Sequence, residues 1–357
     1  MPKILALVTD AFGGRGGIAQ YNRDLLTALA TTGSKVVIVP RHAPDVERPP
    51  VGIGQRPARF GRLAYSLSAI VEALRMKPEI VFCGHLYMAP LAWFAATLTG
   101  AKLVMQTHGI EAWHRPSRLR RWACEQAAMI LSVSRYTRAR VLDWAAIPPE
   151  RAVVIPNTVA DCFTPGDAAA LHHEWALEGK KVMLTVGRMS ASERYKGQDR
   201  VIEALPELIT AGQDVVYVIA GEGDDRPRLE QLALEVGVSD RVRFVGALPL
   251  ETLIEAYRMA DLFVMPSTGE GFGIAFLEAM ACGTPALGLD AAGARDALCD
   301  GKLGQAEVKQ EFRSTLARMI STAGQDSQKL SGAVREHFGR ERFASAVRSA
   351  MLRPVEV

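Results

Sequence analysis

The sequence is poor in cysteine and contains no long hydrophobic run. Its five cysteines are scattered among 357 residues, and none forms a Cys-x-x-Cys pair. This spacing disfavours a zinc site or a disulfide framework and fits a reducing compartment. No stretch of about 18 apolar residues is present, so no transmembrane helix is predicted. The N-terminal MPKILALVTDAFGG has the pattern of a first β-strand and lacks that of a signal peptide. We therefore expect a cytoplasmic protein.

Net charge is also small for a chain of this length. Lys and Arg number 42 and Asp and Glu 39, a formal charge of +3, which argues against a dedicated nucleic-acid binder. Hydrophobic residues at 48% and charged residues at 23% exclude a disordered chain, and the length suggests two domains. The charge is unevenly divided. Residues 1–165 carry 20 basic and 11 acidic residues, a net +9, and residues 166–357 carry 22 and 28, a net −6.

Short apolar runs alternate with longer amphipathic segments along the chain. The runs lack strict two-residue alternation, so we expect strands that are buried on both faces. Amphipathic stretches such as residues 18–32, 199–211, 226–236 and 251–259 predict helices between them. This alternation predicts an α/β fold, and about eleven strands fit two parallel sheets better than one. The expected strands are residues 4–9, 35–39, 79–83, 102–106, 129–133, 153–155, 181–186, 215–220, 242–245, 262–265 and 285–289.

The expected domain boundary lies in IPNTVADCFTPGDAAA, which is rich in turn-forming residues. With the hinge at residues 161–166, the N-terminal domain covers residues 1–162 and the C-terminal domain residues 163–339. Residues 340–352 have a helical pattern with no strand after it. The segment 340–357 is expected to pack back on the N-terminal domain.

Four glycines follow the first expected strand and precede a helix, in the segment GGRGG at residues 13–17. A glycine-rich turn at this place lets the backbone approach an anion at the helix N-terminus. A dinucleotide site would need G-x-G-x-x-G and an acid about 20 residues further on, whereas the second strand here ends in Pro-Arg-His. A nicotinamide enzyme is therefore disfavoured. The loop is either a plain tight turn or the contact for a ligand between the domains.

Two segments of the second half have phosphate-binding character. In TVGRMSASERYKG, Arg188 follows a strand and Lys196 lies eight residues later. Ligands of parallel sheets lie outside the carboxyl ends of the strands, where these cations would neutralise a diphosphate. Alone, the pair fits a solvated loop equally well.

The second of these segments is FVMPSTGEGFGIAFLEAMACGTP. It combines a strand end, three glycines and a helix whose N-terminus suits phosphate oxygens. Glu270 precedes this helix, and Glu278 lies about two turns along it. Carboxylates at these two places would bind hydroxyls on either side of a diphosphate. The combination disfavours the alternative of two solvated glutamates.

The chain resembles the retaining glycosyltransferases of family 4 (group 1), which have the GT-B fold of two Rossmann-like domains facing a central cleft. The resemblance covers nearly the whole chain and depends on motifs in a fixed order. These motifs are GGRGG at 13–17, THG at 107–109, SVSRYT at 132–137, IPNTV at 155–159, GR to YKG at 187–197, AGEGDDRPRL at 220–229, RFVGALP at 243–249 and the E-x7-E element at 270–278.

The resemblance implies a role for each matching residue. Arg188 and Lys196 would bind the donor diphosphate and stabilise charge on the leaving group, and Glu278 would hold the ribose. Glu270 would hold the transferred sugar. Backbone amides of the loop would assist it, and they belong to Gly271, Phe272 and Gly273.

In the N-terminal domain, the resemblance implies that Gly16 and Gly17 lie against the donor phosphates. His108 would face the donor sugar near the reacting centre. Two departures from the family pattern occur in the second half. AAGARDAL replaces GG-x-x-E, so that Gly293 is retained but the acid is at best Asp296. The segment QAEVKQEF stands where the family has an apolar stretch that includes a proline, which predicts a trimmed loop.

The implied reaction moves a hexose from GDP-mannose or a UDP-hexose to a hydroxyl of a glycan or lipid-linked acceptor, in polysaccharide or glycolipid synthesis. No nucleophile is evident, which favours departure and attack on the same face. No D-x-D motif occurs, and we expect Arg188 and Lys196 to neutralise the diphosphate without a metal or other cofactor.

The charge excess of the first half is concentrated in AWHRPSRLRRWACEQ, which also contains two tryptophans. Basic residues with interfacial aromatics suit an anionic membrane surface. Peripheral contact with the inner face of the membrane is therefore expected there, and a solvated helix face is the alternative. The cations concerned are Arg115, Arg118, Arg120 and Arg121.

Two other functions remain open at the level of sequence. A non-catalytic nucleotide-sugar-binding partner subunit is one, and the intact acidic and basic motif residues weigh against it. The other is a GT-B epimerase or phosphorylase, although no lysine marks a pyridoxal site.

Overall fold

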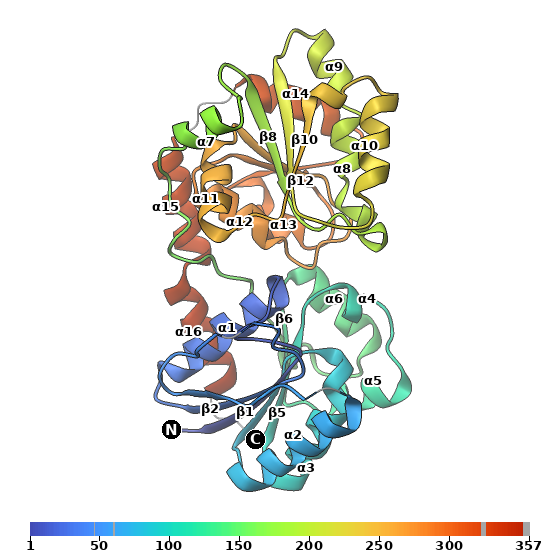
Figure 1. Ribbon diagram of the computed structural model, residues 1–357. Helices are drawn as coiled ribbons and strands as arrows, with labels where there is room; N and C mark the ends of the chain where they lie inside the picture. Colours follow the sequence, from blue (N-terminus) through green and yellow to red (C-terminus); the bar gives the residue numbers. More distant parts are fainter. Residues whose placement is uncertain (46, 60, 323–325, 353–357) are drawn as a thin grey trace. The chain divides into compact units, whose positions relative to one another are not determined.

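The computed structural model describes residues 1–45, 47–59, 61–322 and 326–352. These residues form two compact units (Figure 1). The N-terminal unit comprises Met1–Thr158 together with the chain from Arg340 onward, and the C-terminal unit comprises Val159–Gly339. The chain thus first passes from the N-terminal unit to the C-terminal unit after Thr158, before the expected hinge at residues 161–166. The second crossing coincides with the start of the last helix.

The N-terminal unit is built on a seven-stranded sheet in the order β3-β2-β1-β4-β5-β6-β7, in which every pair is parallel. Its strands are β1 (Lys3–Val8), β2 (Lys35–Pro40), β3 (Ile53–Gln55), β4 (Ile80–Cys83), β5 (Lys102–Thr107), β6 (Met129–Ser132) and β7 (Ala152–Val154). Its α-helices are α1 (Gly17–Ala30), α2 (Arg62–Met76), α3 (Ala89–Thr99), α4 (Ile110–Trp113), α5 (Arg118–Glu125), α6 (Arg135–Trp144) and α16 (Arg340–Leu352).

The C-terminal unit is built on a six-stranded parallel sheet in the order β10-β9-β8-β11-β12-β13. Its strands are β8 (Lys181–Val186), β9 (Val215–Ala220), β10 (Val242–Gly246), β11 (Leu262–Met265), β12 (Ala286–Leu289) and β13 (Gln305–Glu307). Its α-helices are α7 (Ala169–Glu174), α8 (Gln198–Ile202), α9 (Leu205–Thr210), α10 (Arg226–Glu235), α11 (Leu250–Met259), α12 (Ile274–Ala281), α13 (Ala294–Ala297), α14 (Phe312–Ser321) and α15 (Ser327–Phe338).

Burial on both faces explains why the strands read as unbroken apolar runs. In β9 all six residues are buried, and in β1 every residue after Lys3 is buried. Helices cover both sides of each sheet (Figure 1). The predicted α/β fold of two parallel, Rossmann-like sheets is therefore confirmed.

The strand order reverses once in each sheet, and this fixes where a ligand can bind. The reversal lies between β1 and β4 in the N-terminal unit and between β8 and β11 in the C-terminal unit. At such a point the adjoining loops diverge and leave a crevice outside the carboxyl ends of the strands. The glycine loop follows β1, and the segments with Arg188 and Glu270 follow β8 and β11.

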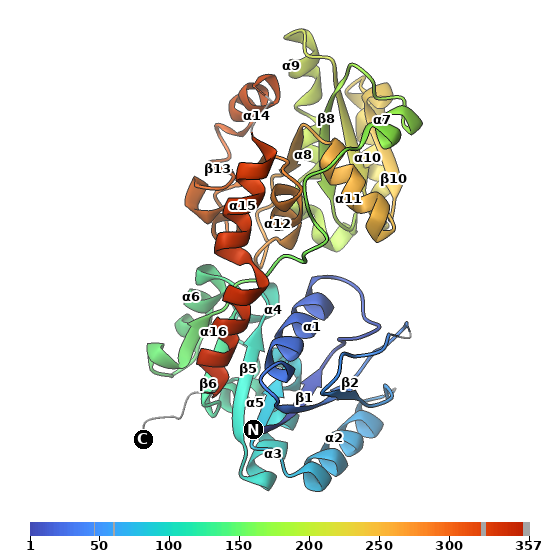
Figure 2. The same ribbon diagram turned by 90° about the vertical axis from the view of Figure 1, so that its left-hand side faces the viewer.

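Two helices pack along neighbours that are far away in sequence. Helix α16 packs on α1 within the N-terminal unit, where the rings of Phe343 and Tyr21 meet edge to face at 5.6 Å. Helix α15 lies along α12 within the C-terminal unit (Figure 2). The described part of the C-terminal segment ends at Leu352, and residues 353–357 lie outside the described residues.

The structure differs from the sequence analysis in one predicted helix and in two strands that were not predicted. The stretch 199–211 forms two helices, because Pro206 at the start of α9 cannot continue the backbone hydrogen bonding of α8. The short edge strands β3 and β13 were not predicted. β13 consists of the first three residues of QAEVKQEF and pairs with β12 from Leu287 to Leu289. The expected trimming of the loop in this segment stays a prediction.

Other expectations concern the cysteines and the membrane. Cys83, Cys124 and Cys282 are buried, Cys299 is partly exposed and Cys162 is exposed. Within the described ranges, no helix is both long and apolar enough to cross a membrane.

Candidate functional site

The loops after β8 and β11 bring three of the predicted site residues together. Arg188 follows β8, and Lys196 ends a short 3₁₀ helix, Ala191–Lys196. Glu193, in the same turn, bridges them: one carboxylate oxygen accepts a hydrogen bond from the Arg188 guanidinium, and the other lies 3.1 Å from Lys196 Nζ. The two cations are therefore held close together by an internal anion.

Glu270 lies within electrostatic reach of this cluster. Burial raises the pKa of its carboxyl group, and the nearby Lys196 ammonium opposes that rise. Within the described residues, the buried Glu270 Oε1 has no hydrogen-bond partner. An unpaired buried oxygen is costly, and a hydroxyl donor placed there would remove that cost.

Tyr195, in the loop after β8, packs against the loop after β11. A Cβ atom on Gly269 would lie 2.8 Å from the Tyr195 ring, and Thr268 N donates to Tyr195 O at 2.9 Å. The glycine at 269 is therefore required for close packing. This contact holds the Glu270 loop against the turn that contains Lys196.

Helix α12 begins after Gly273, whose φ of +97° is readily adopted only by glycine. Phe272 is buried, with its ring 5.7 Å from that of Phe338. The predicted role of its amide is compatible with this arrangement.

Glu278 lies on α12 and is held by a residue that the sequence analysis missed. Tyr257 Oη, on α11, donates a hydrogen bond to Glu278 Oε2 at 2.7 Å. Burial raises the pKa of Glu278 to about 7, and the hydrogen bond from Tyr257 opposes that rise. The carboxyl group therefore titrates near neutral pH.

The loop after β12 departs from the family pattern in sequence, and its backbone contacts the Glu270 loop. Gly293 N donates to Glu270 O at 2.9 Å. A Cβ atom at Gly293 would lie 2.0 Å from Gly271 O. The retained glycine thus supports the Glu270 loop, and Asp296 lies in the short helix α13 that follows.

The glycines after β1 fall into two pairs with different surroundings. A Cβ atom on Gly13 would clash with Asp45 O at 1.9 Å, and one on Gly14 would meet Asp10 Cβ at 2.7 Å. Gly16 and Gly17, by contrast, have open space where a Cβ atom would lie. The first pair packs the loop, and the second pair leaves the start of α1 approachable.

His108 follows β5 and is kept neutral. Burial lowers the pKa of its imidazole, and its Nε2 donates to Gly84 O at 2.9 Å. This hydrogen bond leaves Nδ1 as the acceptor of the ring. The backbone N–H of His108 donates to Glu111 Oε1 at 2.5 Å.

A second histidine, His85, lies at the end of the neighbouring strand β4. Its ring centroid is 6.2 Å from that of His108, and its Nδ1 accepts a hydrogen bond from Tyr87 N at 3.2 Å. Burial lowers the pKa of His85 to about 4. No local motif marks this residue, since only the pairing of β4 with β5 brings it beside His108.

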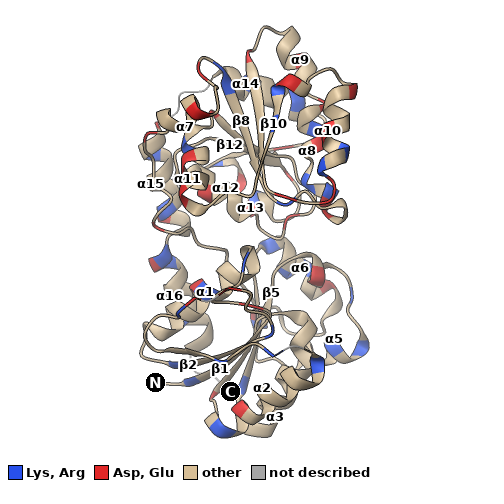
Figure 3. Cartoon of the chain, viewed as in Figure 1, with Lys and Arg blue, Asp and Glu red and all other residues tan. Residues whose placement is uncertain are grey.

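The four arginines predicted to face a membrane differ in their surroundings. Arg115 and Arg118 are exposed. The Arg120 guanidinium lies 4.7 Å above the Tyr87 ring, and Arg121 pairs with Glu125 at 2.7 Å. Figure 3 shows the basic residues along α5.

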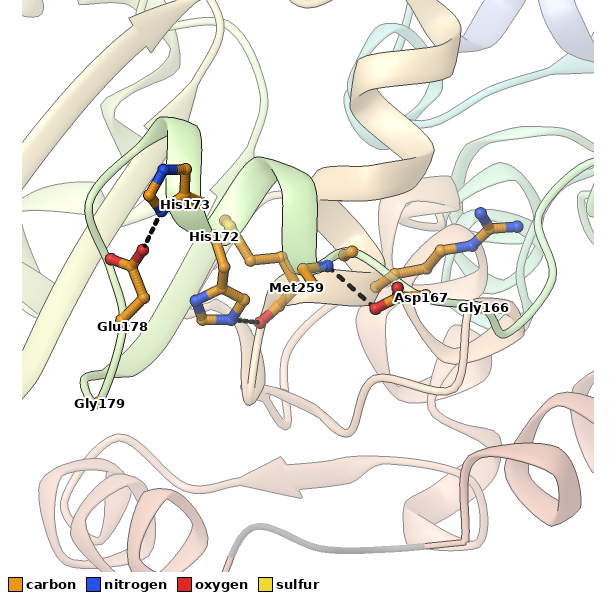
Figure 4. Close-up of a pocket in the computed structure, with 10 residues that line it drawn as sticks. Gly166, Asp167, His172, His173, Glu178, Gly179 and Met259 are labelled. Atoms are coloured by element: carbon orange, nitrogen blue, oxygen red, sulfur yellow. Dashed lines mark hydrogen bonds and ion pairs between the residues drawn. The ribbon is translucent and has the colours of Figure 1, made fainter.

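One surface pocket of about 500 Å³ lies elsewhere in the C-terminal unit. Helix α7 and the end of α11 line it, and His173 Nδ1 contacts Glu178 Oε1 at 2.7 Å on its rim (Figure 4). None of the predicted site residues lines this pocket. In the part of the chain that the structure describes, no three His, Cys, Asp or Glu side chains are grouped to hold a metal ion.

Comparison with known proteins gives two matching family models. Glycosyl transferases group 1 matches residues 168–336, and glycosyltransferase family 4 matches residues 15–161. A GDP-mannose-dependent alpha-(1-6)-phosphatidylinositol monomannoside mannosyltransferase from Mycolicibacterium smegmatis is 32% identical over 84% of this chain and 84% of its own length. A D-inositol 3-phosphate glycosyltransferase from Geodermatophilus obscurus is 28% identical over 92% and 82%, respectively.

Solved structures share the fold. HepE from Anabaena, crystallised in complex with UDP, matches with a TM-score of 0.80 over 98% of this chain and 99% of its own. Its sequence identity is 18%, so this likeness concerns architecture alone.

Proposed function

The chain belongs to the group 1, family 4 glycosyltransferases, and from this premise we propose that it transfers a hexose from a nucleotide-diphosphate sugar to an acceptor hydroxyl with retention of configuration. GDP-mannose is the proposed donor, because the relative from M. smegmatis is by name GDP-mannose-dependent. A UDP-hexose is the second candidate, since HepE was crystallised with UDP.

The observation that carries the proposal is the unpaired carboxylate oxygen of Glu270 beside two cations. Glu270 Oε1 is buried, and the charges of Lys196 and Arg188 act on its carboxyl group. A sugar hydroxyl would supply the missing donor, and the adjoining diphosphate would meet the cations. A nucleotide sugar has both groups next to each other.

The chemistry follows from where charge develops. As the bond to the sugar breaks, negative charge grows on the departing diphosphate. Arg188, Lys196 and the first amides of α12 are proposed to stabilise that charge, a form of catalysis in which one donor is worth about 10²–10³ in rate. The diphosphate would displace Glu193 as the partner of both cations. No metal or other cofactor is part of the proposal.

Other residues are proposed to hold the remaining parts of the substrates. Glu278 would accept hydrogen bonds from the ribose hydroxyls, Gly16 and Gly17 would contact phosphate oxygens, and His108 Nδ1 would accept a hydrogen bond from a sugar hydroxyl. The acceptor would be a glycan or a lipid-linked molecule, in polysaccharide or glycolipid synthesis. Arg115 and Arg118, which are exposed, would attract an anionic membrane surface.

Replacing Lys196 tests the assignment of the leaving-group cation. Lys196→Ala is expected to lower kcat by about 10²–10³ and to weaken GDP binding. Release of GDP from GDP-mannose would be measured with phosphatidylinositol monomannoside as acceptor, and calorimetry with GDP provides a readout independent of the acceptor. The same two measurements would be made with UDP-glucose as the donor and with UDP as the calorimetric ligand.

Lys309→Ala is the matched control, because Lys309 is an exposed lysine of the same unit. It should leave kcat and GDP affinity unchanged. Wild-type kcat and wild-type GDP affinity in the Lys196→Ala protein would overturn the assignment.

A further inference from the structure

The chain enters and leaves the C-terminal unit at two places that are hydrogen-bonded to each other. Val159 is the first residue of this unit, and Gly339 is its last. Val159 N donates to the carbonyl oxygen of Phe338, the residue before Gly339, at 3.2 Å. The start and the end of the unit are therefore held together by its own backbone.

The side chain of Phe338 contacts the loop that contains Glu270. Its ring and that of Phe272 meet edge to face with centroids 5.7 Å apart, and both side chains are buried. From Gly269 to Gly273 the sequence alternates glycine with Glu270 and Phe272, so Phe272 is the only apolar side chain of this stretch. An edge-to-face pair of rings has a preferred geometry as well as buried area. Phe338 therefore fixes the residue two positions after Glu270.

Helix α15 gives Phe338 a fixed position, because it is bonded to α12. Ser331 Oγ, on α15, donates to Ala281 O, on α12, at 2.7 Å. Figure 2 shows the two helices side by side. Phe272 lies just before α12 and Phe338 is the last residue of α15. Packing of these two helices thus brings the two rings together.

The segment that enters the unit reaches the second donor-site acid through another aromatic contact. Phe163 lies four residues after Val159, and its buried ring is 6.0 Å from that of Tyr257. Tyr257 is the residue whose hydroxyl group donates to Glu278. Arg335 of α15 donates to Phe163 O. The entering segment is therefore held between α15 and the tyrosine that binds Glu278.

We infer that Phe338 and Phe163 are positioning residues of the donor site. Phe338 sets the place of Glu270 through its contact with Phe272. Phe163 sets the place of Glu278 through the tyrosine that hydrogen-bonds it. For the roles of the two acids the inference rests on the proposed function, whereas the contacts themselves do not depend on it.

Nucleotide affinities measured by calorimetry separate the two positioning roles. Under the proposed function Glu270 holds the sugar, which GDP lacks. Phe338→Leu should therefore weaken binding of GDP-mannose about tenfold, as expected when a hydrogen bond to a charged group is weakened, and leave binding of GDP unchanged. Glu278 holds the ribose, so Phe163→Leu should weaken binding of both ligands by the same factor. UDP-glucose and UDP would be measured in the same way.

A second variant of the same aromatic pair guards against an effect peculiar to one substitution. Phe272→Leu removes the other ring and should show the same difference between GDP-mannose and GDP. The double variant Phe272→Leu/Phe338→Leu should bind GDP-mannose no more weakly than either single variant, because the two rings form one contact. Additive losses in the double variant would contradict a shared role.

Phe312→Leu is the matched control, because Phe312 is also buried in the core of the C-terminal unit, on α14. It should lower Tm as the other variants do, since a buried ring is lost in each. Its affinities for GDP-mannose and GDP should equal those of the wild type. Wild-type affinities in Phe338→Leu and Phe163→Leu as well would overturn the inference.

Hydrogen exchange of the ligand-free protein distinguishes failure of this inference from failure of the proposed function. The amides of Thr268 and Gly293 are hydrogen-bonded in the contacts that hold the Glu270 loop. Phe338→Leu should speed their exchange about tenfold by easing local opening, whereas Phe312→Leu should leave it unchanged. If no nucleotide sugar binds the wild type and exchange still behaves in this way, the proposed function fails and the positioning of the loop stands. Unchanged exchange at both amides in Phe338→Leu would overturn the inference.

Discussion

At the scale of single residues, the candidate site is defined by the partners of its charged groups. Glu193 holds Arg188 and Lys196 together, and Tyr257 holds Glu278. Arg188, Lys196 and Glu278 are therefore already ion-paired or hydrogen-bonded within the protein before a substrate binds. Donor binding under the proposal therefore exchanges partners, because a diphosphate takes the place of the Glu193 carboxylate.

The Tyr257–Glu278 hydrogen bond predicts a pH dependence. The pKa of Glu278 is about 7, and only its carboxylate form accepts two ribose hydroxyl donors, so KM for the donor should fall as pH rises through about 7. Tyr257→Phe removes the hydrogen bond that lowers this pKa. The midpoint of the KM profile should therefore move upward by about 0.5–1 pH unit.

Tyr217→Phe is the control for this measurement. Tyr217 is also buried in the C-terminal unit, but its hydroxyl group bonds to Thr185 at 2.7 Å. Its KM profile should match that of the wild type. If the profile of Tyr257→Phe is also unchanged, the hydrogen bond does not set the protonation of Glu278.

At the scale of elements, the loops after the strands support one another through their backbones. Gly187 N donates to Ala220 O at 2.9 Å, and Met189 N donates to Glu222 O at 2.8 Å. Gly293 N joins the loop after β12 to Glu270 O. The site is thus a set of interlocked loops at the carboxyl edge of one sheet, and their glycines are the points of closest approach.

Gly293→Ala tests whether this interlocking matters for activity. Its Cβ atom would lie 2.0 Å from Gly271 O and 2.4 Å from Gly271 C, which are backbone atoms that cannot yield without moving the Glu270 loop. We expect kcat/KM to fall by about 10–100-fold, since a displacement of about 1 Å can cost that much.

Gly332→Ala, on α15, provides the comparison, because a Cβ atom there meets no atom within 4 Å. It should keep full activity and raise stability by about 0.5–1 kcal/mol. Full activity in Gly293→Ala would show that the Glu270 loop does not depend on this contact.

At the scale of the whole molecule, the chain is two Rossmann-like units joined by two crossings. Charge is divided between them in the sequence, and the proposed diphosphate site belongs to the unit in the acidic half. Under the proposal, Arg188, Lys196 and the N-terminus of α12 bind the diphosphate there, and the net charge of the unit does not attract it.

Thermal unfolding of the whole protein tests the donor. A ligand at 100 times its Kd adds about 2.7 kcal/mol to stability, so GDP-mannose should raise Tm measurably. UDP-glucose should raise it less if the donor base is guanine. Glu278→Gln should lose most of the shift. A Tm unmoved by either nucleotide sugar would contradict the proposed donor class.

The sequence by itself determined the alternation of strands and helices, the two-sheet architecture and the segments that carry Arg188, Lys196, Glu270 and Glu278. These features are local, because periodicity, glycines and strand ends lie within short windows of the chain. The family motifs that these segments match are also short stretches of sequence. The final helix was predicted for the same reason, and its observed bounds are Arg340–Leu352.

Only the tertiary structure decided what those segments touch. Tyr257 lies 21 residues from Glu278, and His85 meets His108 through strand pairing, so neither contact has a local signal. The three-residue edge strands β3 and β13 exist because a neighbouring strand supplies their hydrogen bonds. Helix α2 has apolar side chains on two sides, with Tyr65 and Ala69 buried and Leu63 and Leu67 exposed, and the sequence alone does not say which side packs on the core. Packing settled that question, since only one side of a helix can face the sheet that it covers.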